Sequence, residues 1–209
     1  MDFTTLTRLL PEEKTKHWMN QEAHLYEKGE YMLSPGESAI YVILKGTAQI
    51  FQLHPDGKEC VIDIASKGEC IGLIEFISER EPQRFVRAMT PVRAVVLPKK
   101  EVKQMIKSSS EVALQLLRYT ANKLEETFDI LQQVAYGKVE ERLLFTLKKL
   151  AIKNEDSAKT YYEIPLFLTH KDLAGMIGST RETVTFLINK LLNEGELIQR
   201  NQTLLVKKD

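Results

Sequence analysis

The sequence has little cysteine, little tryptophan and no excess of either charge. Two cysteines and one tryptophan occur among 209 residues. Two thiols cannot build a disulfide framework or a complete structural zinc site, and they suit a reducing compartment. No apolar run approaches the roughly 20 residues that span a bilayer, and the first five residues have neither the basic nor the apolar character of a secretion signal. We therefore expect a cytoplasmic protein without a membrane partner.

Catalytic signatures are missing as well. The chain contains no P-loop, no Gly-rich dinucleotide turn, no HExxH pattern and no recognisable Ser/His/Asp set. We predict that the protein is not an enzyme, with no catalytic residues and no metal ligands. No cofactor is firmly implied.

The net charge is zero because 29 Lys and Arg balance 29 Asp and Glu. This balance would argue against a nucleic-acid partner only if the charge were evenly spread. Residues 138–209 hold 12 basic and 10 acidic side chains, so the remainder is slightly acidic. Since electrostatic affinity depends on a local face rather than on the total, the balance does not exclude DNA.

Short strands are predicted between about residues 20 and 100. Glycines recur there about every ten residues, and Pro55-Asp56-Gly57 is typical of a hairpin turn. Strand-like runs lie between these turns, at residues 39–44, 48–53, 60–64 and 92–97. The pattern favours an all-β sandwich or barrel, preceded by a helix that ends near Asn20.

A long helix is predicted next, because no glycine or proline occurs between Lys99 and Tyr136. After a short helix at 100–107, Ser108 and Glu111 have the spacing of a capping box, from which a helix of about 25 residues starts. Its apolar side chains repeat every seven residues: Leu117, Ala121, Leu124, Phe128, Leu131 and Ala135. This seam predicts a homodimer through paired helices; the alternative is a helix lying on its own β-domain.

The third region begins after Gly137 and contains a helix-turn-helix. A helix carrying Leu143 to Ala151 and a polar loop at 154–157 precede it. Thr169 with Asp172, and Ser179 with Glu182, have capping-box spacing, so two helices start there, with Gly178 in the turn. In such a motif the second helix enters the major groove of DNA. A small hairpin, or wing, is predicted over residues 197–206, followed by Lys207 and Lys208.

The exposed residues of the second helix suit base reading. Arg181 can contact guanine O6 and N7, and Glu182 can accept from cytosine N4. Under the alternative interpretation both are surface charges, and Glu182 merely caps its helix. The full predicted DNA-binding set is Thr169, His170, Ser179, Thr180, Arg181, Glu182, Thr183, Thr185, Phe186, Lys190 and Arg200.

The order of β-domain, long helix and winged helix-turn-helix resembles the CRP/FNR family of bacterial transcription regulators. The run Gly178 to Val184 (GSTRETV) carries the resemblance most specifically, and Val86-Arg87-Ala88 also matches. The resemblance implies an α+β fold with a cupin-like β-roll (double-stranded β-helix) in 1–107, a dimerisation helix and hinge in 108–137, and a DNA-binding domain in 138–209. It also implies a palindromic operator and RNA polymerase as a partner. We expect an activator or repressor that recognises DNA as a homodimer.

Two departures from the family pattern concern specificity and the effector. Phe186 stands where the family usually has an arginine, so the half-site should differ. Cyclic-nucleotide members hold the ribose with a Glu and the phosphate with an Arg, but this chain has Leu73 and Pro82 at those places. The candidate effector pocket is Leu73, Glu75, Arg84, Arg87 and Thr127. We expect an effector other than cAMP, or activity without one.

Redox control is the remaining alternative. The family's iron–sulfur type is excluded, because no cysteine precedes Cys60. Cys60 and Cys70 lie on neighbouring predicted strands and can form a reversible disulfide if their Cα atoms approach within about 7 Å. A protein that senses a cyclic nucleotide or redox state without acting on transcription is the alternative function.

Overall fold

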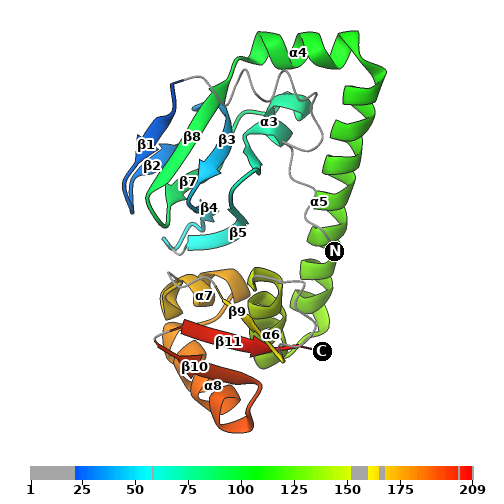
Figure 1. Cartoon of the computed structure of the whole chain (residues 1–209). Helices are drawn as coiled ribbons and strands as arrows, with labels where there is room; N and C mark the ends of the chain where they lie inside the picture. Colours follow the sequence, from blue (N-terminus) through cyan, green and yellow to red (C-terminus); the bar gives the residue numbers. More distant parts are fainter. Residues whose placement is uncertain (1–21, 58, 152–159, 165–167, 202, 209) are drawn as a thin grey trace. The chain divides into compact units, whose positions relative to one another are not determined.

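The computed structural model describes residues 22–57, 59–151, 160–164, 168–201 and 203–208 (Figure 1). The chain forms two compact units, Met1–Glu126 and Thr127–Asp209. The boundary falls inside the long helix α5 (Ser110–Tyr136), so α5 belongs to both. The predicted N-terminal helix and the polar loop at 154–157 lie outside the described residues.

Unit 1 is built on two four-stranded antiparallel sheets. One has the order β1-β8-β3-β6 and the other β2-β7-β4-β5. The strands are β1 (His24–Tyr26), β2 (Tyr31–Leu33), β3 (Ile40–Lys45), β4 (Ala48–Leu53), β5 (Glu59–Ala65), β6 (Cys70–Ile71), β7 (Phe85–Ala88) and β8 (Val92–Leu97). The hairpin expected at residues 55–57 connects β4 to β5, with the Gly57 amide donating to the His54 carbonyl at 2.8 Å. The strands predicted from the glycine spacing are therefore confirmed.

Strand β3 shows why its sequence is an unbroken apolar run. Tyr41 and Ile43 face the core between the two sheets, whereas Ile40 and Val42 face a second core on the other side. Three helices cover that second face: α3 (Leu73–Ser78), α4 (Lys99–Ser108) and the first half of α5 (Figure 1). A strand buried on both faces loses the alternation of apolar and polar residues that a half-buried strand shows.

Two glycines in unit 1 allow close backbone contacts. Gly72, which precedes α3, has φ 80°, and a Cβ atom there would lie 2.0 Å from the Ala39 carbonyl oxygen. Gly46, in the turn between β3 and β4, has φ 88°, and its Cβ would lie 2.2 Å from the Pro91 carbonyl oxygen. Any other residue would force these backbone segments apart.

The junction of α4 and α5 differs from the prediction by one residue. Ser109, not Ser108, caps α5: its hydroxyl accepts from the Val112 amide at 3.3 Å. The Ser108 side chain instead donates to the Met105 carbonyl at the end of α4. Because α5 then runs for 27 residues to Tyr136, the predicted long helix and its end at Gly137 are confirmed.

The described residues of unit 2 form three helices packed against a small sheet. The elements are α6 (Val139–Leu150), β9 (Tyr161–Glu163), α7 (His170–Ile177), α8 (Arg181–Glu194), β10 (Leu197–Arg200) and β11 (Thr203–Lys207). Their core includes Leu143, Leu147, Leu191, Leu197 and Val206, each almost wholly buried. β10 and β11 form the predicted wing, and β9 adds a third strand that the sequence pattern did not indicate. The α+β architecture is confirmed.

Candidate nucleic-acid interface

Helices α7 and α8 form a helix-turn-helix with a three-residue turn. At the start of α7, the Thr169 hydroxyl accepts from the Asp172 amide at 3.2 Å, and the Asp172 carboxylate accepts from the Thr169 amide at 2.8 Å. This reciprocal capping box is as predicted. Gly178 closes α7 in the left-handed conformation, with φ 60°. Such a turn lets the two helices cross around a shared apolar contact.

The cap of α8 corrects the sequence prediction and changes the role of Glu182. Thr180, not Ser179, is the N-cap, and its hydroxyl accepts from the Thr183 amide at 3.2 Å. Thr180 and Thr183 are also linked through their hydroxyls at 2.9 Å. Glu182 therefore does not cap α8, and its side chain is exposed to solvent. The interpretation of Glu182 as a cap is wrong.

One face of α8 is buried and the opposite face is open. Its buried residues are Val184, Leu187, Ile188 and Leu191. Arg181, Glu182, Phe186 and Asn189 are exposed, and Glu182, Phe186 and Asn189 follow one another at helical spacing. Asn193 and Glu194, at the end of α8, are exposed as well. Within the described parts of the chain, no hydrogen bond or ion pair engages the side chains of Arg181 or Glu182. Arginine, carboxylate and amide side chains on one open helix face are the groups that read base edges.

Asn189 was missed by the sequence analysis. It lies one turn beyond Phe186 on the same exposed face. An asparagine amide can make two hydrogen bonds to adenine N6 and N7. Extending the exposed face of α8 by helical spacing beyond the predicted residues would have found it.

His170 and Thr185 bind each other, which links α7 to α8. The His170 Nδ1 and the Thr185 hydroxyl lie 2.8 Å apart, and the same hydroxyl donates to the Arg181 carbonyl at 2.9 Å. When the hydroxyl donates its one proton to the Arg181 carbonyl, it can accept from His170 in the tautomer that carries the hydrogen on Nδ1. Both residues were predicted to contact DNA; the structure shows them fixing the helix that presents Arg181.

Several basic side chains of unit 2 have partners within the protein. The Lys190 ammonium lies 2.5 Å from Glu140 on α6 and 3.7 Å from Glu194, so it joins α8 to α6. Lys207 pairs with Glu196 at 3.3 Å, and Lys208 lies over the Tyr162 ring. Arg200, at the end of β10 in the wing, is exposed. Arg200 is therefore better placed than Lys190 to meet a DNA backbone.

The seven-residue seam of α5 is exposed along its whole length. Leu117, Leu124 and Leu131 expose 64%, 53% and 60% of their surface, and Ala121, Phe128 and Ala135 are exposed as well. Leu114 extends the seam by one position toward the start of α5. The alternative of a helix lying on its own β-domain holds for another stripe of α5 but not for this seam. Monomeric proteins rarely expose so continuous an apolar stripe.

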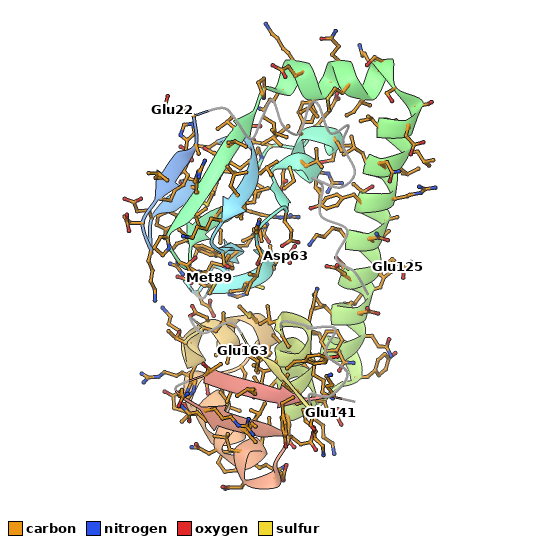
Figure 2. The ribbon with its side chains drawn as sticks, viewed as in Figure 1. Glu22, Asp63, Met89, Glu125, Glu141 and Glu163 are labelled. Atoms are coloured by element: carbon orange, nitrogen blue, oxygen red, sulfur yellow. The ribbon has the colours of Figure 1, made fainter. Side chains whose placement is uncertain are left out.

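A second stripe of α5 contacts unit 1 and ends in a charged cluster. Val112, Leu116 and Tyr119 pack into the core, and Lys123 follows at the same helical spacing. The Lys123 ammonium lies 3.0 Å from Asp63 on β5, 3.2 Å from Glu69 and 3.5 Å from Glu126. Figure 2 labels Asp63 on β5. We call these four residues the Lys123 cluster.

The pKa values in the Lys123 cluster reflect burial and close charges. Burial lowers the pKa of the Lys123 ammonium, but the neighbouring carboxylates outweigh burial, so the pKa lies above its usual range. Burial raises the pKa of Glu69, and the charge of Lys123 offsets only part of this effect. Lys123 therefore stays protonated and holds α5 to the strands. The sequence analysis missed this cluster because its members are far apart in the chain.

The predicted effector residues do not gather into one site. Glu75 and Arg84 form an ion pair at 3.2 Å. Leu73 is instead 1% exposed within the apolar core, and Thr127 lies on the exposed surface of α5. Glu75 and Arg84 therefore engage each other, whereas Leu73 and Thr127 lie apart from this pair.

Arg87 belongs to a different cluster, on the outer face of the second sheet. Its guanidinium makes two hydrogen bonds to Glu59, at 3.1 and 2.6 Å, and lies 4.8 Å from the centre of the Phe51 ring. Phe51 in turn stacks on Phe85 with centroids 5.3 Å apart. The Glu59 hydrogen bonds, which are the largest influence, raise the pKa of Arg87. Arg87 therefore stabilises the sheet.

Cys60 and Cys70 are free thiols in different sheets. Cys60 lies on β5 in the second sheet and is exposed, whereas Cys70 lies on β6 in the first sheet. The expectation that they occupy neighbouring strands is wrong. Burial raises the pKa of the Cys70 thiol, which disfavours the reactive thiolate. The geometry gives no support to a redox pair.

Among the residues that the structure describes, no cluster of three or more His, Cys, Asp or Glu side chains suits a metal ion. None of the described helices combines the length and apolar character required to cross a membrane.

Comparison with known proteins agrees with this geometry. Residues 23–109 match the model of the cyclic nucleotide-binding domain, and residues 141–208 match the Crp-like helix-turn-helix domain. The global nitrogen regulator of Synechocystis is 27% identical over 177 residues, covering 83% of this chain and 78% of that protein. The cAMP-activated global transcriptional regulator CRP of Salmonella typhimurium is 24% identical over 199 residues, covering 93% of this chain and 94% of that protein.

Solved structures share the fold. FixK2 from Bradyrhizobium japonicum matches with a TM-score of 0.77 at 19% identity, covering 90% of this chain and 92% of that chain. A CRP/FNR family regulator from Thermus thermophilus matches with a TM-score of 0.68 at 22% identity, covering 90% of this chain and 94% of that chain. Proteins of this family are regulators and not enzymes. With a cyclic nucleotide-binding domain followed by a long helix and a Crp-like helix-turn-helix, the chain belongs to the CRP/FNR family of DNA-binding transcription regulators.

Proposed function

We propose that the protein is a homodimeric bacterial regulator that binds a palindromic operator through α8 and acts in the cytoplasm. The observation that carries the proposal is the open face of α8, where Arg181 and Glu182 are exposed while the opposite face is buried. Arg181 would read a guanine and Glu182 a cytosine. The exposed Arg200 in the wing would contact the phosphate backbone, and RNA polymerase would be the partner through which DNA binding affects transcription.

The exposed seam of α5 supports the dimer. Two copies of α5 that paired along Leu117, Leu124 and Leu131 would bury side chains that water now surrounds. A two-fold dimer of this kind would present two α8 helices to successive major grooves. The half-sites would then lie about 34 Å apart, one turn of DNA, and would be related by the same two-fold axis.

We propose further that unit 1 controls the dimer through α5. The same helix carries the seam on one stripe and Lys123 on another, so a change at the Lys123 cluster can shift the seam. The Salmonella relative is named for activation by cAMP. This chain would differ, because Leu73 is buried in the core and Glu75 is neutralised by Arg84. Its effector would be another small molecule, or the protein would be active without one.

Arg181→Ala tests the proposal. Wild type should select a palindromic sequence from a random DNA pool and bind it far more tightly than unrelated DNA. The variant should lose about 1–3 kcal/mol of discrimination in each half-site, while its weak, salt-dependent binding remains. Fluorescence anisotropy against the selected and a scrambled duplex measures both.

Arg93→Ala is the matched control, since it removes an exposed arginine from β8 in unit 1. It should leave the discrimination unchanged. Failure of wild type to select any sequence would refute the proposed function. Equal discrimination by wild type and Arg181→Ala would refute the role of Arg181.

A further inference from the structure

The open face of α8 carries a large aromatic side chain among polar ones. Phe186 exposes 68% of its surface, although its helix neighbours Leu187 and Ile188 are buried. A phenyl ring at this position could pack against its own domain or contact a thymine methyl group. This exposure removes the first role. An exposed phenyl ring has an unfavourable contact with water that only a partner can remove.

Under the proposed function, DNA would be that partner, because Phe186 lies on the exposed face of α8. Glu182 lies four residues before Phe186 and Asn189 three after, so all three point from the same side of α8. A phenyl ring has no strong hydrogen-bond donor or acceptor and cannot read a guanine, cytosine or adenine edge. The major groove has one apolar group that identifies a base, the C5-methyl of thymine.

We propose that Phe186 makes the half-site specific for a thymine by packing on its C5-methyl group. This inference rests on the proposed function, because it assumes that α8 enters the major groove. With a rise of about 1.5 Å per residue, Phe186 lies about 6 Å along α8 from Glu182. At about 3.4 Å per base step, the thymine lies within about two steps of the base that Glu182 contacts.

The hydrogen bonds of His170 and Thr185 fix the part of α8 that carries Phe186. The Thr185 hydroxyl is held by the Arg181 carbonyl and by His170 on α7. Thr185 precedes Phe186 directly, so the backbone that presents the ring is fixed from two helices. A contact presented by a fixed helix can distinguish one methyl group, whereas a mobile ring would adapt to any base.

Deoxyuridine scanning tests the proposal, because uracil differs from thymine only by the missing methyl. Each thymine of the selected operator is replaced by deoxyuridine, in symmetric pairs, and the affinity is measured. Wild type should lose about fourfold for each methyl, and so about fifteenfold for one symmetric pair. At that pair, Phe186→Ala should bind the thymine and deoxyuridine operators equally.

Two further variants separate the contact from other effects. Phe186→Leu keeps an apolar side chain and should retain part of the thymine preference. Arg181→Ala should bind more weakly overall and keep the full preference at the same pair. Since Phe186 is exposed, Phe186→Ala should melt at the wild-type temperature, which circular dichroism checks.

Two outcomes would overturn the inference and leave the proposed function intact. One is a selected operator at which no thymine-to-deoxyuridine change lowers wild-type affinity. The other is a thymine preference that persists at full strength in Phe186→Ala, because another residue would then contact the methyl. If wild type selects no sequence at all, the proposed function fails and this inference fails with it.

Discussion

The two apolar stripes of α5 have opposite surroundings. Val112, Leu116 and Tyr119 are buried against the β-sheet and α3 of unit 1. Leu117, Leu124 and Leu131 lie on another side of the same helix and are exposed. The first stripe contains one of the cluster's charges, Lys123, whereas the exposed seam contains none. The same helix thus carries one apolar stripe that is buried within its own unit and one that is exposed to solvent.

Because of this difference, the buried stripe should affect the folding stability of one chain, and the exposed seam should affect the association of two chains. The covered stripe contributes to the stability of a single chain, because its partners belong to the same unit. The seam contributes nothing to an isolated chain and, in the proposed dimer, contributes only when a second copy is present. Substitutions in the two stripes should therefore change different measured quantities, and the following predictions run from the largest expected effect to the smallest.

Leu124→Glu should have the largest effect, on association. In a dimer the variant would place two like charges face to face in an apolar seam, which costs several kcal/mol. We expect monomers at concentrations where wild type is dimeric, as measured by light scattering. The melting temperature of the monomer should stay high, because Leu124 is largely exposed and lies outside the described core of unit 1. As a control, Asn122→Glu adds the same charge at an exposed position off the seam and should leave the dimer intact. If Leu124→Glu still formed dimers, that result would contradict the proposed interface.

Leu116→Ala should affect folding. Leu116 is 5% exposed in the core of unit 1, and removing a buried leucine side chain costs about 2–5 kcal/mol of unfolding free energy. Urea unfolding measures the loss. The folded variant should remain dimeric in the native range. If Leu116→Ala dissociated at lower urea than it unfolded, the buried stripe would also contribute to dimer formation.

Lys123→Met should have a smaller effect on stability. Removing the ammonium leaves Asp63 and Glu69 close together without a cation, and we expect a loss of about 2 kcal/mol, less than the roughly 3–5 for a fully buried pair. Because burial raises the pKa of Glu69, the variant should recover stability as the pH falls through that raised value and Glu69 becomes neutral. Urea midpoints at several pH values check this; a constant deficit would exclude Glu69 as the cause.

Cyclic AMP should have no measurable effect. A ligand that binds the folded protein raises its melting temperature, but buried Leu73 and the Glu75–Arg84 pair offer no free carboxylate for a ribose. We expect the same melting temperature and the same operator affinity with and without cAMP. A rise at micromolar cAMP would show that unit 1 rearranges to form a nucleotide site.

Local patterns made the helices predictable. The seven-residue seam predicted α5, and the capping box at Thr169 predicted the start of α7, because both depend on residues within one or two turns. The two caps that failed, Ser108 and Ser179, each missed by one residue. In both places a second serine or threonine follows directly, and a hydroxyl at either position can reach a free amide. Tertiary packing decides between them.

Contacts between distant segments were not predictable. The Lys123 cluster joins α5 to β5 and to the loop before β6 across more than fifty residues. Cys60 and Cys70 looked like neighbours, yet their strands belong to different sheets, because β5 pairs with β4 and β6 with β3. Strand β9 was missed because its three residues pair with β11, far along the chain. None of these pairings leaves a trace in local periodicity.

In the proposed regulation, the Lys123 cluster would be the point about which α5 tilts. Between Lys123 and Tyr136 the helix continues for thirteen residues without a break, or about 20 Å at a rise of about 1.5 Å per residue. A tilt of about 10° at this point would move the far end by about 3.5 Å, close to the rise of about 3.4 Å between stacked base pairs. In the proposed dimer, a shift of this size would change the register between α8 and its half-site by about one base pair.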